Sequence, residues 1–194
     1  MSPTLDLRDA RIVRWGPVEF AARVREAMTI YAEAMGYSPT VVDNRTGYAT
    51  AHADRPGFHA VAALDPDGAL LGFGYGYTSE PGQWWHDQVL RAVDNDVAAR
   101  WLQGSLELCE LHVRPPWHGS GLGRAMLLRL LEGLPHPAVL LSTPEGESRA
   151  WRLYRSLGFQ DLARDHLFPG DSRPFAVLGA RLPLTATETS PVDA

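Results

Sequence analysis

The stretch Leu106–Arg129, LELCELHVRPPWHGSGLGRAMLLR, decides how this chain is expected to fold. A short apolar strand runs into two prolines, and glycines at 119, 121 and 123 follow directly before an amphipathic helix. Glycines at this spacing leave main-chain N–H groups uncovered by side chains. The helix adds its unpaired first-turn donors and the positive end of its dipole. Such a turn between a strand and a helix is typical of a phosphate-binding site.

Composition places the chain among single-domain globular proteins. Its 194 residues are 45% hydrophobic and 21% charged, which is enough for one buried core. No apolar run approaches the roughly 18 residues of a membrane span, and the first residues lack the apolar segment of a signal peptide. The net charge is −5, and no block of basic residues occurs. We therefore expect a cytoplasmic protein with no membrane and no nucleic-acid partner.

Several reactive residue types are scarce. The single cysteine, Cys109, excludes an intramolecular disulfide framework. Its neighbour Glu110 is expected to raise the pKa of the thiol, which favours a structural thiol over an acetyl-cysteine intermediate. All 18 basic residues are arginine, so a Schiff-base or Walker lysine is excluded. The spacing of the seven histidines suits no metal-ligand set, and no metal is expected.

Hydrophobic periodicity predicts an α/β (α+β mixed) architecture. Strands are expected at 5–14, 58–64, 69–77, 105–113, 137–143, 159–168 and 174–182, and helices at 17–35, 84–102, 121–133 and 147–157. The segment 38–57 is compatible with a short helix or a loop. Glycines at 72, 74 and 76 share one strand face, which indicates close approach of another group. We expect a single domain over 1–184 with a helical insert at about 78–104, and a disordered tail over 185–194.

Two motifs carry a family resemblance. The first is Val113-x-Pro115-x-x-His118-Gly119-x-Gly121-x-Gly123, and the second is the helix 149–159, which contains a tyrosine and ends in Gly-Phe. With these motifs in this order, the chain resembles the GNAT superfamily of acyl-CoA-dependent N-acetyltransferases over roughly residues 5–183. The resemblance implies a central mixed, mostly antiparallel sheet of about six or seven strands, splayed at the CoA site and flanked by helices.

The resemblance further implies acetyl-CoA as co-substrate. Main-chain N–H groups of 118–124 are expected to grip its diphosphate, with Arg114 or Arg124 adding charge. A main-chain N–H near Leu111 is expected to bind the acetyl oxygen as it becomes an oxyanion. The residues expected to contact the cofactor are Leu111, His112, Val113, Arg114, His118, Gly119, Ser120, Gly121, Leu122, Gly123, Arg124, Ser142, Ser148 and Trp151.

Four residues are candidates for moving protons. The resemblance places Tyr154 beside the CoA sulfur as a general acid for the leaving thiolate. Glu110, and second Glu107, are candidates for the base that deprotonates an amine, and His112 is a further one. Residues three apart in a regular strand face opposite ways. A β-bulge, which the family usually has near here, breaks that parity.

The acceptor site is expected to involve the least patterned segments. The segment 78–104 either walls the acceptor pocket, with Trp84 stacking on a substrate, or merely packs as a helix. Tyr75 is a second candidate substrate contact. The resemblance implies transfer of an acetyl group to a primary amine, of a small molecule or a peptide, by direct attack in a ternary complex. The alternatives are a catalytically silent CoA-binding module and an acyltransferase with a longer acyl donor. A homodimer is compatible with the resemblance.

Overall fold

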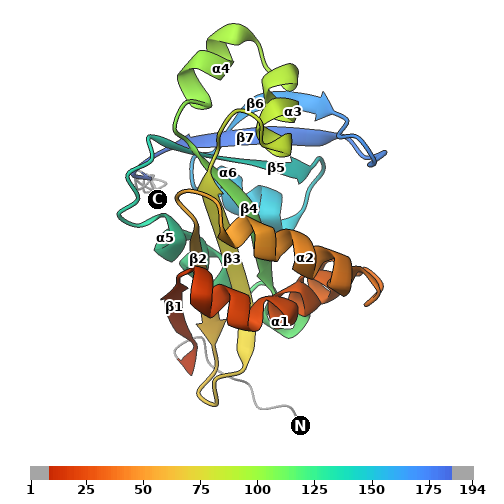
Figure 1. The fold of residues 1–194 in the computed structure, drawn as a ribbon, viewed down its shortest axis with the longest axis vertical. Coiled ribbons are helices and arrows are strands. Elements are labelled where there is room, and N and C mark those ends of the chain that lie inside the picture. Colours follow the sequence, from red (N-terminus) through yellow and green to blue (C-terminus); the bar gives the residue numbers. More distant parts are fainter. Residues whose placement is uncertain (1–8, 185–194) are drawn as a thin grey trace, which may run out of the picture. The chain divides into compact units, whose positions relative to one another are not determined.

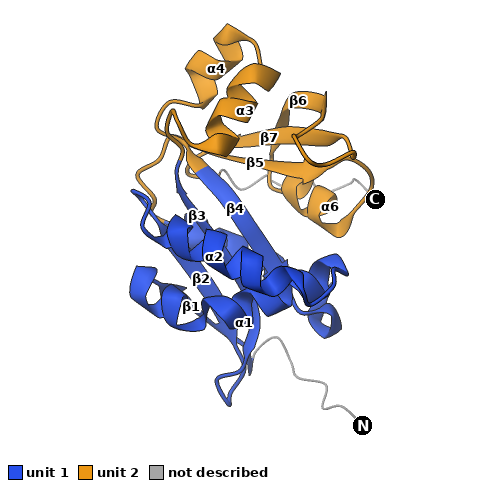
Figure 2. Cartoon of the chain, turned by 45° about the vertical axis from the view of Figure 1, so that its right-hand side comes forward, with its two compact units in different colours: residues 1–78, 107–132 blue, residues 79–106, 133–194 orange. Residues whose placement is uncertain are grey.

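The computed structural model describes residues 9–184 (Figure 1). The chain divides into two compact units, which Figure 2 distinguishes by colour: unit 1 is residues 1–78 and 107–132, and unit 2 is residues 79–106 and 133–194. The tail predicted at 185–194 lies outside the described residues, and the single domain over 1–184 stays a prediction.

Unit 1 is built on four neighbouring strands. In spatial order they are β1 (Arg11–Trp15), β2 (His59–Leu64), β3 (Leu70–Thr78) and β4 (Leu106–Val113), of which only the first residue of β4 lies in unit 2. The pairs β1–β2 and β2–β3 are antiparallel. The β3–β4 pair is antiparallel as well, because Gly72 lies against Val113 while Gly74 lies against Leu111.

The two faces of β3 differ sharply in side-chain size. Phe73, Tyr75 and Tyr77 point to one face, which we call the tyrosine face, and the glycines between them point to the other. A Cβ placed on Gly72 would come within 2.8 Å of the His112 carbonyl oxygen, so the backbone of β4 needs a glycine there. The predicted close approach of another group is thereby confirmed at this glycine.

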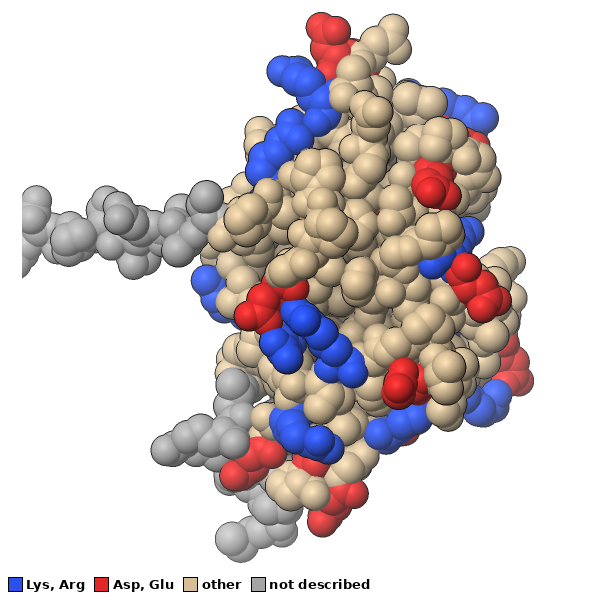
Figure 3. All heavy atoms as spheres, turned by 60° about the vertical axis from the view of Figure 1, so that its left-hand side comes forward, with Lys and Arg blue, Asp and Glu red and all other residues tan. Residues whose placement is uncertain are grey.

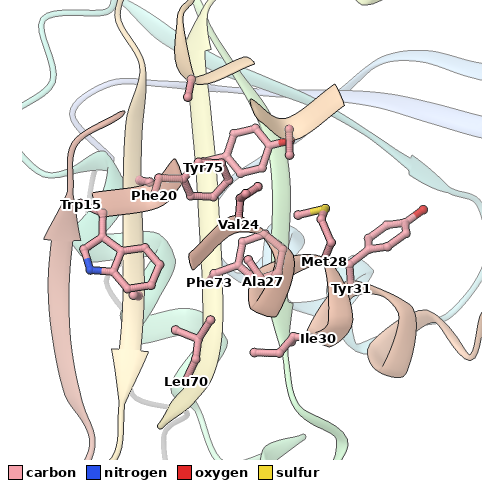
Figure 4. Packing of buried hydrophobic residues seen from close by; sticks show 14 of the residues in the cluster. Trp15, Phe20, Val24, Ala27, Met28, Ile30, Tyr31, Leu70, Phe73 and Tyr75 are labelled. Carbon is pink, nitrogen blue, oxygen red and sulfur yellow. The ribbon is translucent and has the colours of Figure 1, made fainter. Parts of the chain in front are cut away.

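Two helices cover the tyrosine face. The helix α1 (Pro17–Met35) buries an apolar face, which includes Phe20, Val24 and Ala27, against β1–β3, as Figure 4 shows. The helix α2 (Val41–Ala53) packs beside it and resolves the open prediction for the segment 38–57. The opposite face is covered by α5 (Leu122–Leu131), which packs on β1, β2 and β3. Five apolar residues of α5 are buried: Leu122, Met126, Leu127, Leu130 and Leu131.

Unit 2 has three strands and three helices. The strands are β5 (Ala138–Pro144), β6 (Gln160–His166) and β7 (Phe175–Arg181), with β7 in the middle and both pairings antiparallel. The helices are α3 (Trp84–Ala92), α4 (Asn95–Trp101) and α6 (Arg149–Ser156). Trp101 of α4 packs directly on Gly179 of β7, where a Cβ would lie 3.0 Å from the indole.

The prediction of one helix over 84–102 was wrong. Val93 is extended, with φ −113° and ψ 157°, and separates α3 from α4. The Asp94 carboxylate then accepts a hydrogen bond from the Val97 amide at 2.7 Å and caps the second helix. Apolar residues of the two helices nevertheless belong to one buried cluster, which contains Trp85, Val89 and Trp101.

The described residues contain seven strands and six α-helices, and every pairing given above is antiparallel. The predicted α/β (α+β mixed) class with mostly antiparallel strands is therefore confirmed, while the predicted splay of the sheet stays a prediction. Over residues 9–184, no helix combines the length and the apolar character that a membrane crossing requires. On the face shown in Figure 3, acidic and basic side chains are interspersed.

Candidate active site

The predicted phosphate turn lies entirely in unit 1. After β4, a short 3-10 helix (Pro115–Trp117, labelled η2) leads into the glycine turn, residues 118–123, and then into α5. Gly119 and Gly121 have φ values of 79° and 89°, in the left-handed region that glycine adopts without strain. A Cβ at either position would meet no atom within 4 Å, so the space over these two residues is open.

The amides of the glycine turn fall into two groups. Those of His118 and Ser120 donate to carbonyls of η2, at 3.0 and 3.3 Å. The amides of the three glycines, by contrast, donate to no protein acceptor within residues 9–184. The Leu122 amide, at the start of α5, donates to the Ser120 hydroxyl at 3.3 Å. The three glycine amides are therefore available to an anion beside the positive end of the α5 dipole, and the expected grip of 118–124 on a diphosphate stays a prediction.

Two polar side chains beside the turn are held within unit 1. His118 Nε2 lies 2.7 Å from the Val113 carbonyl oxygen and fastens the start of the turn to the end of β4. Arg114 donates to the Leu70 carbonyl and forms an ion pair with Glu33, both at 2.7 Å. Of the two arginines expected to add charge at the diphosphate, Arg114 is thus already neutralised by a protein carboxylate.

The first half of β4 points two polar side chains to the tyrosine face. The Tyr77 hydroxyl donates to Glu107 Oε1 at 3.0 Å. The thiol of Cys109 lies 3.5 Å from the Tyr75 hydroxyl. Glu107 and Cys109 are two residues apart, as regular strand alternation requires.

In the second half of β4, the side chains of Glu110 and His112 also lie on the tyrosine face. The ring of His112 lies 5.7 Å from that of Phe73, and its Nε2 lies 2.6 Å from Glu110 Oε2. Consecutive residues Cys109 and Glu110 therefore face the same side, which interrupts the alternation as a β-bulge does. The expected break of parity is confirmed, and it brings Glu107 and Glu110 to one face.

The Glu107 carboxyl is tuned for proton exchange near neutral pH. Its residue is 3% exposed, and burial raises its pKa from 4.5 to about 7, against the opposing effects of the Tyr77 hydrogen bond and the Arg55 charge. Its Oε2 atom is buried and has no hydrogen-bond partner within residues 9–184. A carboxyl group with these properties is suited to general acid–base work.

A series of polar side chains extends from the Glu107 region to His52 on α2. The Tyr75 hydroxyl lies 3.0 Å from His52 Nδ1, and the Cys109 thiol lies 3.6 Å from the same nitrogen. Burial, with help from Arg55, lowers the pKa of His52 to about 4, so this imidazole is neutral at pH 7. Burial of the thiol, and the charges of both β4 glutamates, raise the pKa of Cys109 well above its ordinary value, as expected.

Other predicted site residues lie in unit 2. Tyr154 is buried on α6, with its ring 5.4 Å from that of Phe159. Trp151 lies on the same helix, and its amide donates to the Ser148 hydroxyl that caps α6. The Ser142 hydroxyl accepts a hydrogen bond from an indole of α3 at 2.9 Å. The roles expected for these residues stay predictions.

The two expected substrate contacts differ in accessibility. Trp84 is 54% exposed at the start of α3, with its ring 5.8 Å from that of Phe168. Tyr75 is only 2% exposed and is bonded inside unit 1. Sequence reasoning missed three participants in the cluster, His52, Arg55 and Tyr77, of which only Tyr77 carried a signal, its period-two spacing from Tyr75.

Comparisons with known proteins agree on one family. Residues 24–159 match the Acetyltransferase (GNAT) family. The chain is 40% identical over 197 residues to the GCN5-like protein acetyltransferase Rv2170 of Mycobacterium tuberculosis, an alignment that covers 87% of this chain and 96% of that protein.

Solved structures show the same fold at low identity. A GNAT-family protein from Desulfovibrio desulfuricans superposes with a TM-score of 0.62 at 18% identity, covering 89% of this chain and 98% of that one. The protein yncA of Salmonella typhimurium, solved with its cofactor acetyl-CoA, superposes with a TM-score of 0.59 at 18% identity, covering 95% and 98%.

Proposed function

The chain belongs to the GNAT family of acetyltransferases, and from that premise we propose that it transfers the acetyl group of acetyl-CoA directly to a primary amine. The observation that carries the proposal is the pairing of two features within unit 1: a glycine turn suited to an anion, and two carboxylates on one face of the strand that leads into it.

Binding of acetyl-CoA follows from the turn. The free amides of Gly119, Gly121 and Gly123 and the first turn of α5 supply donors for the diphosphate. The Leu111 amide, next to the β-bulge, is proposed to donate to the acetyl oxygen as negative charge develops on it.

Proton removal from the amine is assigned to Glu110. An alkyl ammonium has a pKa of about 10.4 and must lose its proton before it attacks. The Glu110 side chain is 16% exposed, against a 3% exposed Glu107, so an acceptor reaches it more easily. His112 Nε2, at 2.6 Å, orients this carboxylate. Glu107, whose burial raises its pKa to about 7, is the second candidate.

The transfer step forms a carbon–nitrogen bond and breaks a carbon–sulfur bond. The neutral amine nitrogen forms a bond to the acetyl carbon, and the carbon–sulfur bond breaks with its electron pair going to sulfur. The base has already taken one proton from the ammonium group. The second proton leaves the nitrogen as the amide forms and replaces the one that Tyr154 is proposed to give to the thiolate, so one proton is released to solvent per turnover. A phenol of pKa about 10 can serve a thiol of pKa about 8.5, because the two acidities are close.

The acceptor amine is proposed to belong to a protein side chain, a peptide or a small molecule. The relative from Mycobacterium tuberculosis is named a protein acetyltransferase, which supports an amine of a protein as acceptor for this chain.

The test is transfer to a panel of amines by the purified protein. Acetyl-CoA is supplied with lysine derivatives and lysine-containing peptides, and the acetylated products are identified by mass spectrometry. We expect amine-dependent release of CoA together with a product of matching mass. Tight binding of CoA with no product from any amine would indicate a silent binding module instead. Faster transfer from propionyl- or succinyl-CoA would indicate a longer acyl donor.

A further inference from the structure

Two arginines border the tyrosine face on the side of α2. Arg45 lies on the same side of α2 as His52, two turns earlier, and Arg55 lies just after the helix ends. The Arg45 guanidinium lies 5.0 Å from the centre of the Tyr31 ring, and that of Arg55 lies 4.5 Å from the centre of the Tyr77 ring. Both guanidinium groups are therefore placed by cation–π contacts.

The rings of Tyr77 and Tyr31 each contact a candidate base or its partner. The Tyr77 hydroxyl donates to Glu107, so Arg55 stands one ring away from that carboxylate. The Tyr31 ring meets the ring of His112 edge-on at 5.1 Å, and His112 is the partner of Glu110. The two arginines thus flank the polar cluster at both of its carboxylates.

The charges of Arg45 and Arg55 both act on the imidazole of His52. Burial has the largest effect and lowers the pKa of His52. The charges of Arg55 and Arg45 lower it further, while the charge of Glu110 raises it. Two guanidinium groups therefore contribute a positive field at the cluster.

Neither arginine has a carboxylate partner within the described part of the chain. Other arginines of unit 1 do have one: Arg25 pairs with Asp43, and Arg114 pairs with Glu33. Acidic residues outnumber basic ones in this chain, 23 to 18, so partners are not scarce overall. The planar, bidentate donors of Arg45 and Arg55 remain available to a carboxylate of another molecule.

We infer that Arg45 and Arg55 select acceptors that carry a carboxylate close to the amine, such as an amino acid or a lysine flanked by acidic residues. This inference rests on the proposed function. An acceptor amine arrives as a cation, and two guanidinium groups repel it. A neighbouring carboxylate on the acceptor reverses the sign of that interaction, and charge complementarity of this kind sets specificity more than raw affinity.

The test compares acceptors that differ only in the carboxylate. The small-molecule arm uses Nα-acetyl-lysine and its carboxamide. The peptide arm uses a blocked peptide with lysine between two aspartates, and the same peptide with two asparagines. In at least one arm we expect kcat/KM to be about tenfold or more higher for the acidic member at low salt, a difference that shrinks as salt screens the charges. The arm that shows it identifies the source of the carboxylate.

The variants test the assignment to these residues. In the double variant Arg45→Gln with Arg55→Gln, the ratio of kcat/KM values is expected to fall to about one. The ratio at a fixed pH is compared because loss of Arg55 also changes the pKa of Glu107, which affects both acceptors alike. Arg11→Gln on β1, which the order β1-β2-β3-β4 puts at the far edge of the four strands, is the matched control and keeps the wild-type ratio. If the double Gln variant fails to fold, Arg45→Lys with Arg55→Lys is measured in its place. This variant keeps both charges and should retain part of the preference.

Several outcomes overturn the inference and leave the proposed function standing. These are a wild-type ratio near one, a preference for the uncharged members, or a ratio that survives the double Gln variant. Should no amine be acetylated at all, the proposed function fails. Calorimetry of the same acceptors with the CoA-loaded protein then decides the inference separately, and equal affinity for both members of each pair contradicts it.

Discussion

The charge of the buried residue Glu107 couples the stability of the fold to pH. Its folded pKa of about 7 lies above the ordinary 4.5, so the folded protein holds this proton more tightly than the unfolded chain does. The corresponding stability is fully present below pH 4.5 and is lost as the pH rises to about 7. A shift of this size corresponds to about 3 kcal/mol.

We therefore expect the free energy of unfolding of the wild type to fall by about 3 kcal/mol over that window relative to Glu107→Gln. Urea unfolding at several pH values measures it. Tyr77→Phe removes the hydrogen bond that lowers this pKa, so its loss of stability should extend to higher pH. Parallel pH curves for wild type and Glu107→Gln would show that the buried carboxyl titrates at its ordinary pKa.

Tyr154 can be tested by removing one oxygen. In Tyr154→Phe the ring still packs on Phe159, so we expect little change in the affinity for acetyl-CoA. Loss of the proton donor should lower kcat by at least about tenfold. Steady-state kinetics and calorimetric binding separate the two effects. Wild-type turnover in this variant would remove Tyr154 from the mechanism.

At the scale of the element, the glycine turn depends on backbone conformation. Gly121 has φ 89°, so Gly121→Ala strains the turn and shifts the amides before α5. We expect the affinity for acetyl-CoA to fall about tenfold or more, which corresponds to about 1.4 kcal/mol of binding free energy. Isothermal titration of acetyl-CoA measures the change.

Gly36→Ala is the matched control for this variant. Gly36 caps α1 with φ 67°, so the control carries a similar backbone strain at a different place in unit 1. It should lose stability and keep its affinity for acetyl-CoA. Equal loss of affinity in both variants would mean that strain alone, and not the turn, weakens binding.

Elements with a strong period were predicted well, and elements with a weak one were not. The apolar stripe of α5 reflects burial of one helix face, and the alternation of β3 separates aromatic side chains on one face from glycines on the other. The sequence records both patterns directly. The helix α2 was left open because Gly47 interrupts it and only Val42, Ala49 and Ala53 are buried. The break between α3 and α4 depends on one side chain, that of Asp94, whose capping role competes with continuation of the helix.

The site was predictable only where its residues are neighbours in sequence. The turn and both β4 glutamates lie in one stretch, and their positions could be read from it. His52 on α2 and Arg55 just after it lie more than 50 residues before Glu107, so only the packing of α2 on the tyrosine face brings them to the cluster. The bulge at Cys109 and Glu110 leaves no mark in the sequence pattern either, because Cys109 is small and Glu110 is polar.

For the whole molecule, the cofactor should act as a stabilising ligand. A ligand that binds only the folded state adds about 2.7 kcal/mol to the free energy of unfolding at a hundred times its Kd. We expect acetyl-CoA to raise Tm by several degrees, and pantetheine, which lacks the diphosphate, to raise it far less at equal concentration. Thermal unfolding with each compound measures this. Equal shifts would show that the turn does not bind the diphosphate.

The position of Cys109 has a practical consequence. It is the only thiol of the chain, and burial among Tyr75, Tyr77 and His52 keeps it protonated. Since disulfide exchange requires a thiolate, the protein itself should hardly react with a chromogenic disulfide such as Ellman's reagent. Turnover can therefore be followed continuously, by colour, with almost no background from the catalyst.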